Sequence, residues 1–211
     1  MTPVSQQLAP PGGWHPAPAS RIPPIALRGA GPRQWLLARA LGLFVKGNPP
    51  AIFLVLMRHW RLFRAWFSFA ARLMPFGRLD RRDTELAILR VGWLCRCRYE
   101  WGHHVAIGLR VGLSAQQVAS VPQGADAPCW EPRQATLLRA VDELHGARIL
   151  SDASWHSLAA HYDQKQLLEL CLLIGHYQML AGTLNSLGLP LDASAETALA
   201  RAPIHPLTAS P

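Results

Sequence analysis

The stretch from Gln164 to Leu187 constrains the fold most strongly, because it is apolar on nearly all sides. Asp163 followed three residues later by Gln166 is typical of a capping box at a helix start, and Gly188 is a typical helix stop. A helix without a polar face has to be covered on several sides. In a chain of 211 residues, this predicts helix-on-helix packing, with part of this helix covered by another subunit.

The region between residues 32 and 192 repeats the helical pattern. Apolar residues recur at spacings of three and four, and no segment alternates convincingly with the period of two that strands require. The fold class is therefore all-α, a single multi-helical domain. The predicted helices cover residues 34–45, 50–74, 80–94, 97–110, 114–121, 132–145, 151–162 and 164–187.

The two ends of the chain differ from this domain. Residues 1–31 are rich in proline and glycine and are predicted to form a disordered or loosely docked arm, and residues 193–211 a C-terminal tail. The first twenty residues lack the apolar core of a signal peptide. We therefore expect a cytoplasmic protein whose cysteines (Cys95, Cys97, Cys129 and Cys171) are reduced.

The formal net charge is +8, nearly all of it from arginine. An excess of arginine is typical of proteins that bind nucleic acid or anionic lipid, but no run of five or more basic residues occurs. The apolar segment Trp35–Met57 is interrupted at Lys46 to Pro50, which leaves pieces too short to span a bilayer. We expect neither a nucleic acid nor a membrane as partner.

Residues 85–104 concentrate the groups that can carry chemistry. Cys97, Glu100 and His104 are spaced i, i+3, i+7, which places them within about 60° of one another on a helix. A thiol, a carboxylate and an imidazole on one face are the parts of a nucleophile or proton-transfer site. A position near a helix N-terminus would lower the pKa of Cys97 and favour a nucleophilic thiolate. The alternative is a small buried apolar residue.

The two carboxylates also have two interpretations each. A Glu85 that faces the apolar core would have a raised pKa and could shuttle protons, whereas one in the first helical turn would be exposed. Glu100 and His104 are spaced for a direct hydrogen bond, either in the site or on the surface. We therefore predict Glu85, Cys97, Glu100 and His104 as catalytic residues. The candidate supporting residues are Cys95, Tyr99, His103 and His176.

A metal site was considered for Cys97, Glu100, His103 and His104. One helix cannot wrap a tetrahedral ion, and the CxC spacing differs from the CxxC pair of a structural zinc site. We expect neither a metal nor another cofactor.

The order and spacing of these motifs resemble the carboxymuconolactone decarboxylase family, which includes alkylhydroperoxidase D. The resemblance spans about residues 35 to 192 and implies an all-helical fold assembled into trimers or hexamers. The segments that carry it are residues 82–90, 99–104, 112–114, 142–145, 150–155, 175–177 and 184–188.

Alkylhydroperoxidase D uses a glutamate, a CxxC pair and a histidine as a proton relay and thiol centre. By spacing, the resemblance assigns these places to Glu85, Cys97 and His104. Glu100 falls where the second, peroxide-attacking cysteine of the pair should be. The CxxC redox cycle therefore cannot run unchanged, although Cys95 or an external thiol could resolve an oxidised Cys97.

Three functions are compatible with this sequence. The first expectation is a thiol-dependent peroxidase acting on a hydroperoxide. The second is an acid–base enzyme acting on a small carboxylic acid or lactone, with Cys97 only lining the pocket. The third is a non-enzymatic helical oligomer that binds anionic partners.

Overall fold

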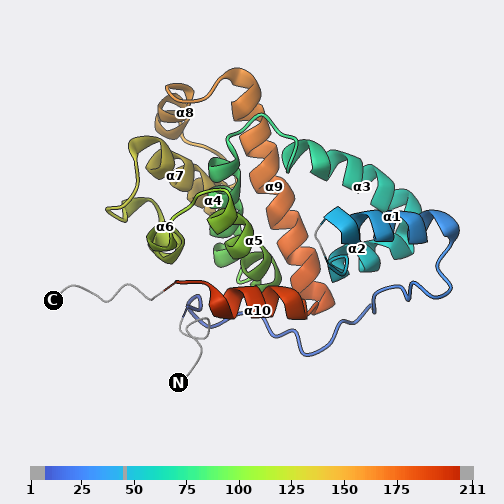
Figure 1. The fold of residues 1–211 in the computed structure, drawn as a ribbon. Coiled ribbons are helices and arrows are strands. Elements are labelled where there is room, and N and C mark those ends of the chain that lie inside the picture. Colours follow the sequence, from blue (N-terminus) through green and yellow to red (C-terminus); the bar gives the residue numbers. More distant parts are fainter. Residues whose placement is uncertain (1–7, 45–46, 205–211) are drawn as a thin grey trace.

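Helix α4 (Arg81–Leu94) lies at the centre of the fold (Figure 1). The computed structural model describes residues 8–44 and 47–204, and all regular structure within these ranges is helical, which confirms the all-α prediction. Every residue of α4 from Asp83 to Trp93 is buried, because α5, α7 and α9 pack around it. The other helices are α1 (Pro32–Phe44), α2 (Ala51–Leu56), α3 (Trp60–Leu73), α5 (Arg98–Arg110), α6 (Ala115–Ser120), α7 (Pro132–Gly146), α8 (Asp152–Ala159), α9 (Gln164–Leu187) and α10 (Ala193–Arg201), with short 3₁₀ turns η2 (Met57–His59) and η3 (Val121–Asp126).

Local capping signals fix most helix ends where the sequence predicts them. Asp80 caps α4 by accepting from the Arg82 N–H at 2.8 Å. Capping boxes begin α6 and α9, and Gly188 ends α9 with a positive φ of 61°. These ends depend on a few neighbouring residues, so the sequence alone suffices to find them.

The predicted helix over residues 50–74 is wrong, because the chain breaks there into α2, η2 and α3. His59 leaves the helical region at φ −104° and ψ 73°, and its Nδ1 accepts from the Leu62 N–H at 3.3 Å. His59 thus ends one helical segment and caps the next. The apolar spacing continues across the break, which is why the sequence pattern did not reveal it.

Residues 8–31, the part of the N-terminal arm that the structure describes, lie against the helical domain. Trp14 packs against Trp93 and Trp101, with ring centroids 5.4 and 5.9 Å away. The Arg96 guanidinium donates to the carbonyls of Gly12 and Gly13, each at 2.5 Å. Residues 1–7 lie outside the described residues.

Replacing Trp14 with alanine is expected to lower the free energy of unfolding by about 2 kcal/mol, because the arm loses its main apolar anchor. Chemical denaturation of the full chain measures this value. Pro18→Ala, at an exposed position of the same arm, should change it by less than about 0.5 kcal/mol. Equal values for Trp14→Ala and the wild type would contradict the docked arm.

The predicted C-terminal tail contains a helix. Residues 193–201 form α10, which packs on α5 through an Arg98–Glu196 ion pair. Asp192, at the start of α10, accepts from Tyr99, His103 and the Ala51 N–H. These contacts tie the C-terminal helix to α5 and α2. Residues 205–211 lie outside the described residues.

Helix α9 is buried on one side and open on the other. Leu170, Leu173, Ile174 and Leu184 lie in the core, whereas Leu168, Leu172 and Met179 are 63, 44 and 54% exposed. Within the described residues α9 is the one helix that is long and apolar enough to cross a membrane, and half of its most apolar stretch is buried. Core helices of folded domains have the same composition.

Candidate active site

Glu85 and His104 form a buried pair between α4 and α5. His104 Nδ1 lies 2.6 Å from Glu85 Oε2, and Arg81 Nη2 donates to Glu85 Oε1 at 2.7 Å. The Glu85 side chain is fully buried and that of His104 is 8% exposed. A carboxylate only accepts hydrogen bonds, so Nδ1 carries the proton and Nε2 is the basic nitrogen of the neutral ring.

Two glycines permit this approach of α4 and α5. A Cβ at Gly92 would lie 3.3 Å from the Trp101 backbone nitrogen. A Cβ at Gly108 would lie 3.1 Å from Leu113 and 3.8 Å from the Glu85 Cβ. Larger residues at either position would push the helices apart and separate Glu85 from His104.

Glu100 lies one turn before His104 on α5 and is buried without a partner. Neither carboxyl oxygen has a hydrogen bond within the described residues. Burial raises the pKa of Glu100 well above its ordinary value, because the buried site disfavours the charged form. The predicted hydrogen bond between Glu100 and His104 is wrong, since His104 Nδ1 is hydrogen-bonded to Glu85 instead.

Tyr177 of α9 closes the other side of this cluster. Its ring meets the His104 ring edge to face, with centroids 5.3 Å apart. Burial raises the pKa of Tyr177 well above its usual range, with smaller contributions from the nearby Glu85 and Glu100. Tyr177 therefore lies near both carboxyl groups, and it is a residue for which no catalytic role was predicted.

His176 lies behind Tyr177, between Trp66 and Phe69 of α3. Burial lowers its pKa to about 4, so the ring is neutral at physiological pH. His176 Nδ1 and Trp66 Nε1 are buried without hydrogen-bond partners among the described residues. His176 thus borders the cluster, and its supporting role stays a prediction.

Cys97 occupies the N-cap position of α5, where the sequence placed it, but its thiol is fully buried. Burial raises the pKa of Cys97 well above its usual value, and the Glu100 carboxyl adds to this effect. The backbone N–H groups of Glu100 and Tyr99 oppose the rise without cancelling it. The expected low-pKa thiolate is therefore wrong: Cys97 is a neutral thiol at pH 7.

Cys95 and Cys97 are free thiols on either side of the turn between α4 and α5. Arg96, with a φ of 53°, breaks the helix between them. The Cys95 sulfur lies 3.8 Å from His145 Nδ1, and burial raises the pKa of Cys95 to about 11. Cys95 thus faces α7.

Tyr99 and His103 belong to a different cluster. The Tyr99 hydroxyl donates to Asp192 Oδ2 at 2.7 Å, and His103 Nε2 lies 2.9 Å from the same oxygen. Their role is to hold α10 and the start of α2 against α5. Of the four candidate metal ligands, His103 contacts Asp192, His104 contacts Glu85, and Cys97 and Glu100 are buried in the core. The described residues contain no group of three or more metal-binding side chains.

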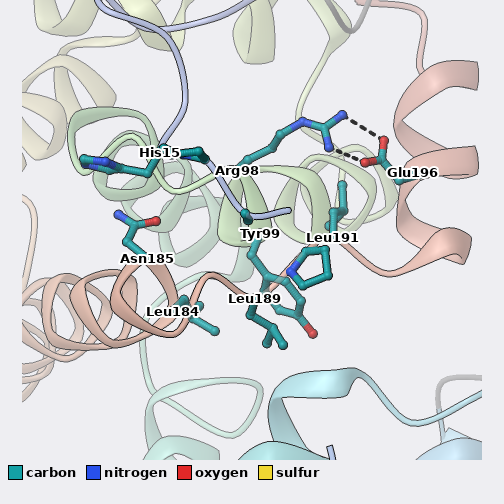
Figure 2. A pocket seen from close by; sticks show the side chains of 11 residues that line it. His15, Arg98, Tyr99, Leu184, Asn185, Leu189, Leu191 and Glu196 are labelled. Atoms are coloured by element: carbon teal, nitrogen blue, oxygen red, sulfur yellow. Dashed lines mark hydrogen bonds and ion pairs between the residues drawn. The ribbon is translucent and has the colours of Figure 1, made fainter. Parts of the chain in front are cut away.

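A pocket of about 240 Å³ lies beside the N-terminal turn of α5 (Figure 2). His15 of the arm, Tyr99, Asn185 and Leu191 line it, and the Arg98–Glu196 ion pair forms one wall. It contains none of Glu85, Glu100, His104 and Tyr177. The pocket is therefore separate from the candidate active site.

Comparison with known proteins finds one family model that matches part of the chain. Residues 61–143, which include Glu85, Cys97, Glu100 and His104, match the model of the carboxymuconolactone decarboxylase family. No curated protein matches the chain.

Several solved structures share the fold of this chain. A peroxidase-related protein with an alkylhydroperoxidase AhpD core from Ralstonia eutropha JMP134 is 18% identical, with a TM-score of 0.75 over 84% of this chain and 95% of that chain. A peroxidase-related protein from Silicibacter sp. TM1040 is 12% identical, with the same TM-score over 86% and 98%. The debrominase Bmp8 is 14% identical, with a TM-score of 0.70 over 86% and 97%. At these identities the likeness supports the fold alone.

Proposed function

We propose that this carboxymuconolactone decarboxylase family protein is an acid–base enzyme that acts on a small carboxylated substrate, such as a carboxylated lactone. The observation that carries the proposal is the buried Glu85–His104 pair one helical turn from the buried, unpartnered carboxyl group of Glu100. In this proposal Glu100 holds its proton at neutral pH. A base and an acid with different proton affinities in one site are the requirement for moving a proton on and off a substrate.

Arg81 supports a carboxylated substrate. Its Nη2 donates a hydrogen bond to Glu85, whereas its Nη1 is buried without a hydrogen-bond partner among the described residues. The Arg81 side chain as a whole is 32% exposed, so a substrate that displaces the cover over the buried Nη1 would reach the guanidinium from this side. Arginine binds carboxylates through paired N–H groups, and the second nitrogen is available for that contact.

The proposed steps follow from these states. Arg81 binds the substrate carboxylate. When CO₂ departs, Glu100 donates its proton to the carbon that receives the released electron pair. His104 Nε2 accepts a proton from solvent, while Glu85 stabilises the resulting imidazolium, and passes it to Glu100, so one proton is consumed for each CO₂ released. Cys97 is an uncharged part of the wall in this scheme.

The experiment that tests the proposal is turnover of a carboxylated lactone by the wild type and by Cys97→Ala. Alanine is the suitable replacement, since a serine would bury a hydroxyl without a partner. We expect Cys97→Ala to keep kcat within about threefold of the wild type, measured by CO₂ release, because no step uses the sulfur. Loss of turnover in a folded Cys97→Ala protein would contradict the acid–base scheme.

A thiol peroxidase is the second candidate, and the position of Cys97 at the N-terminus of α5 favours it. In that case Cys97 would attack a hydroperoxide, and Cys97→Ala would abolish consumption of the peroxide. Mass spectrometry of the wild type after peroxide treatment distinguishes the two candidates. A sulfenic acid or disulfide at Cys97 supports the peroxidase, and an unchanged thiol supports acid–base chemistry.

We also propose a homo-oligomer, a trimer or a hexamer as the family implies, in which the open side of α9 contacts another copy. Leu168, Leu172, Gly175 and Met179 form an exposed stripe on α9 at spacings of three and four. Leu172→Glu with Met179→Glu is expected to shift the wild-type assembly to monomers in sedimentation velocity. Thr197→Glu, at an exposed site on α10, should leave it intact. A wild-type monomer would contradict this proposal.

A further inference from the structure

The basic residues of this chain are distributed unevenly. Residues 1–79 contain ten of the 21 basic residues and none of the 13 acidic residues, a net charge of +10. Residues 80–211 contain the other 11 basic residues and all 13 acidic ones, a net charge of −2. The whole excess of positive charge therefore belongs to the segment that precedes the candidate active site.

The structure brings much of this charge together in a lobe formed by α1, α2 and α3, residues 32–76, which we call the α1–α3 lobe (Figure 1). Figure 1 shows this lobe on the opposite side of α9 from α6, α7 and α8. Its arginines are Arg33, Arg39, Arg58, Arg61, Arg64 and Arg72, and all six are exposed. None of them forms an ion pair with a carboxylate in the described part of the chain.

The same lobe exposes large apolar side chains. On α1, Leu36 and Leu43 are 66 and 78% exposed and lie on the same face, seven residues apart, with Trp35 at 46%. Leu62 on α3 is 58% exposed, and Phe76 just after α3 is 75% exposed. Apolar groups of this size are seldom so exposed together on a surface that contacts only water.

Helix α3 arranges charge and apolar surface side by side. Arg61, Arg64 and Arg72 fall within an arc of about 80° around its axis, and Leu62 lies about 80° beyond one edge of that arc. A shallow groove of about 620 Å³ lies on the other edge, with Leu37, Phe63, Phe67 and Phe76 in its lining and Arg64 and Arg72 among the residues around it. Arginines beside exposed leucine, tryptophan and phenylalanine are typical of a helix that lies in the plane of a membrane surface.

We propose that the α1–α3 lobe docks on an anionic membrane surface, with the arginines on lipid headgroups and Leu36, Leu43 and Phe76 inserted at the acyl boundary. Basic charge alone would fit a nucleic acid equally well. The exposed leucines and Phe76 favour lipid, because their apolar surface would be buried at the acyl boundary and would not be buried against a phosphate backbone. This departs from our expectation of no membrane partner, which rested on the absence of a basic run. In the folded chain, arginines that are scattered in the sequence lie together on the α1–α3 lobe.

The test is flotation of the full-length protein with vesicles of phosphatidylcholine alone or with 30% phosphatidylserine. Near an anionic bilayer each arginine contributes about fivefold in affinity. We expect binding to the anionic vesicles only, weakened at least tenfold by Arg61→Gln/Arg64→Gln/Arg72→Gln. The control, Arg110→Gln/Arg139→Gln/Arg201→Gln, removes the same charge at exposed sites outside the lobe and should change binding by less than twofold.

Two further variants test insertion. Leu36→Ser/Leu43→Ser should weaken vesicle binding at least tenfold, and the blue shift of tryptophan emission on binding should be lost in Trp35→Phe. An equal loss in both arginine triple variants would overturn the proposal, because net charge alone would then explain binding. Absence of binding to anionic vesicles also overturns the proposal. Binding to duplex DNA would then assign the basic surface to a nucleic acid, and loss of the oligomer in Leu36→Ser/Leu43→Ser would assign the apolar surface to a contact between copies.

Discussion

Replacing His104 with glutamine is expected to lower kcat on a carboxylated lactone by about 10²- to 10⁴-fold, the usual contribution of a general base. Glutamine can still donate a hydrogen bond to Glu85, so the fold should persist, but it cannot accept a proton. Glu85→Gln should produce a loss of similar size, because the imidazolium formed at His104 would lose the carboxylate 2.6 Å away. Steady-state CO₂ release measures both.

His103 provides the matched control on the same helix. It is the neighbouring histidine, but it contacts Asp192 and not the site. His103→Gln should keep kcat within about threefold and lower the free energy of unfolding by about 1 kcal/mol, the value of one hydrogen bond. If His103→Gln and His104→Gln lost activity equally, the assignment of the base to His104 would be wrong.

The second large effect is expected at Glu100, where activity and stability should change in opposite directions. Glu100→Leu removes a buried acid without partners and should raise the free energy of unfolding at pH 7 by about 2 kcal/mol, while it abolishes turnover. Glu100→Gln should abolish turnover too, since it cannot donate an acid proton, but it keeps a buried polar group and should stabilise less. Denaturant titrations and CO₂ release measure the two effects.

The stability effect has a defined pH dependence. The pKa of Glu100 is raised in the folded chain, so the folded state binds more protons than the unfolded state once the pH exceeds the ordinary glutamate value of 4.5. The wild type therefore loses stability relative to Glu100→Leu as the pH rises from about 4.5 toward the folded-state pKa. A stability difference that stays constant from pH 4 to pH 8 would show that Glu100 ionises normally.

Features that depend on a few adjacent residues could be predicted from the sequence. The caps at Asp80, Ser114 and Asp163 use side chains two or three residues away from the backbone groups they bind. The helical face shared by Glu100 and His104 follows from spacing alone. The break at His59 could not be found, because the apolar pattern of α2 continues into α3.

Contacts between distant segments could not be predicted. Glu85 and His104 are 19 residues apart and meet only because Gly92 and Gly108 let α4 and α5 approach closely. The pKa of Cys97 depends on how deeply the turn between these helices is buried, which outweighs the effect of the helix N-terminus. The docking of the arm depends on Trp14 meeting two tryptophans about 80 residues away.

The proton on Glu100 is the central claim, and ¹³C NMR of the full-length protein labelled at glutamate carboxyl carbons tests it most directly. The Glu100 signal, assigned by its absence in Glu100→Gln, should have the shift of a protonated carboxyl at pH 7. It should keep that shift through the pH range in which exposed glutamates titrate. A Glu100 signal that titrates with the exposed glutamates near pH 4.5 would contradict the account, because the site would then contain no acid to pair with His104.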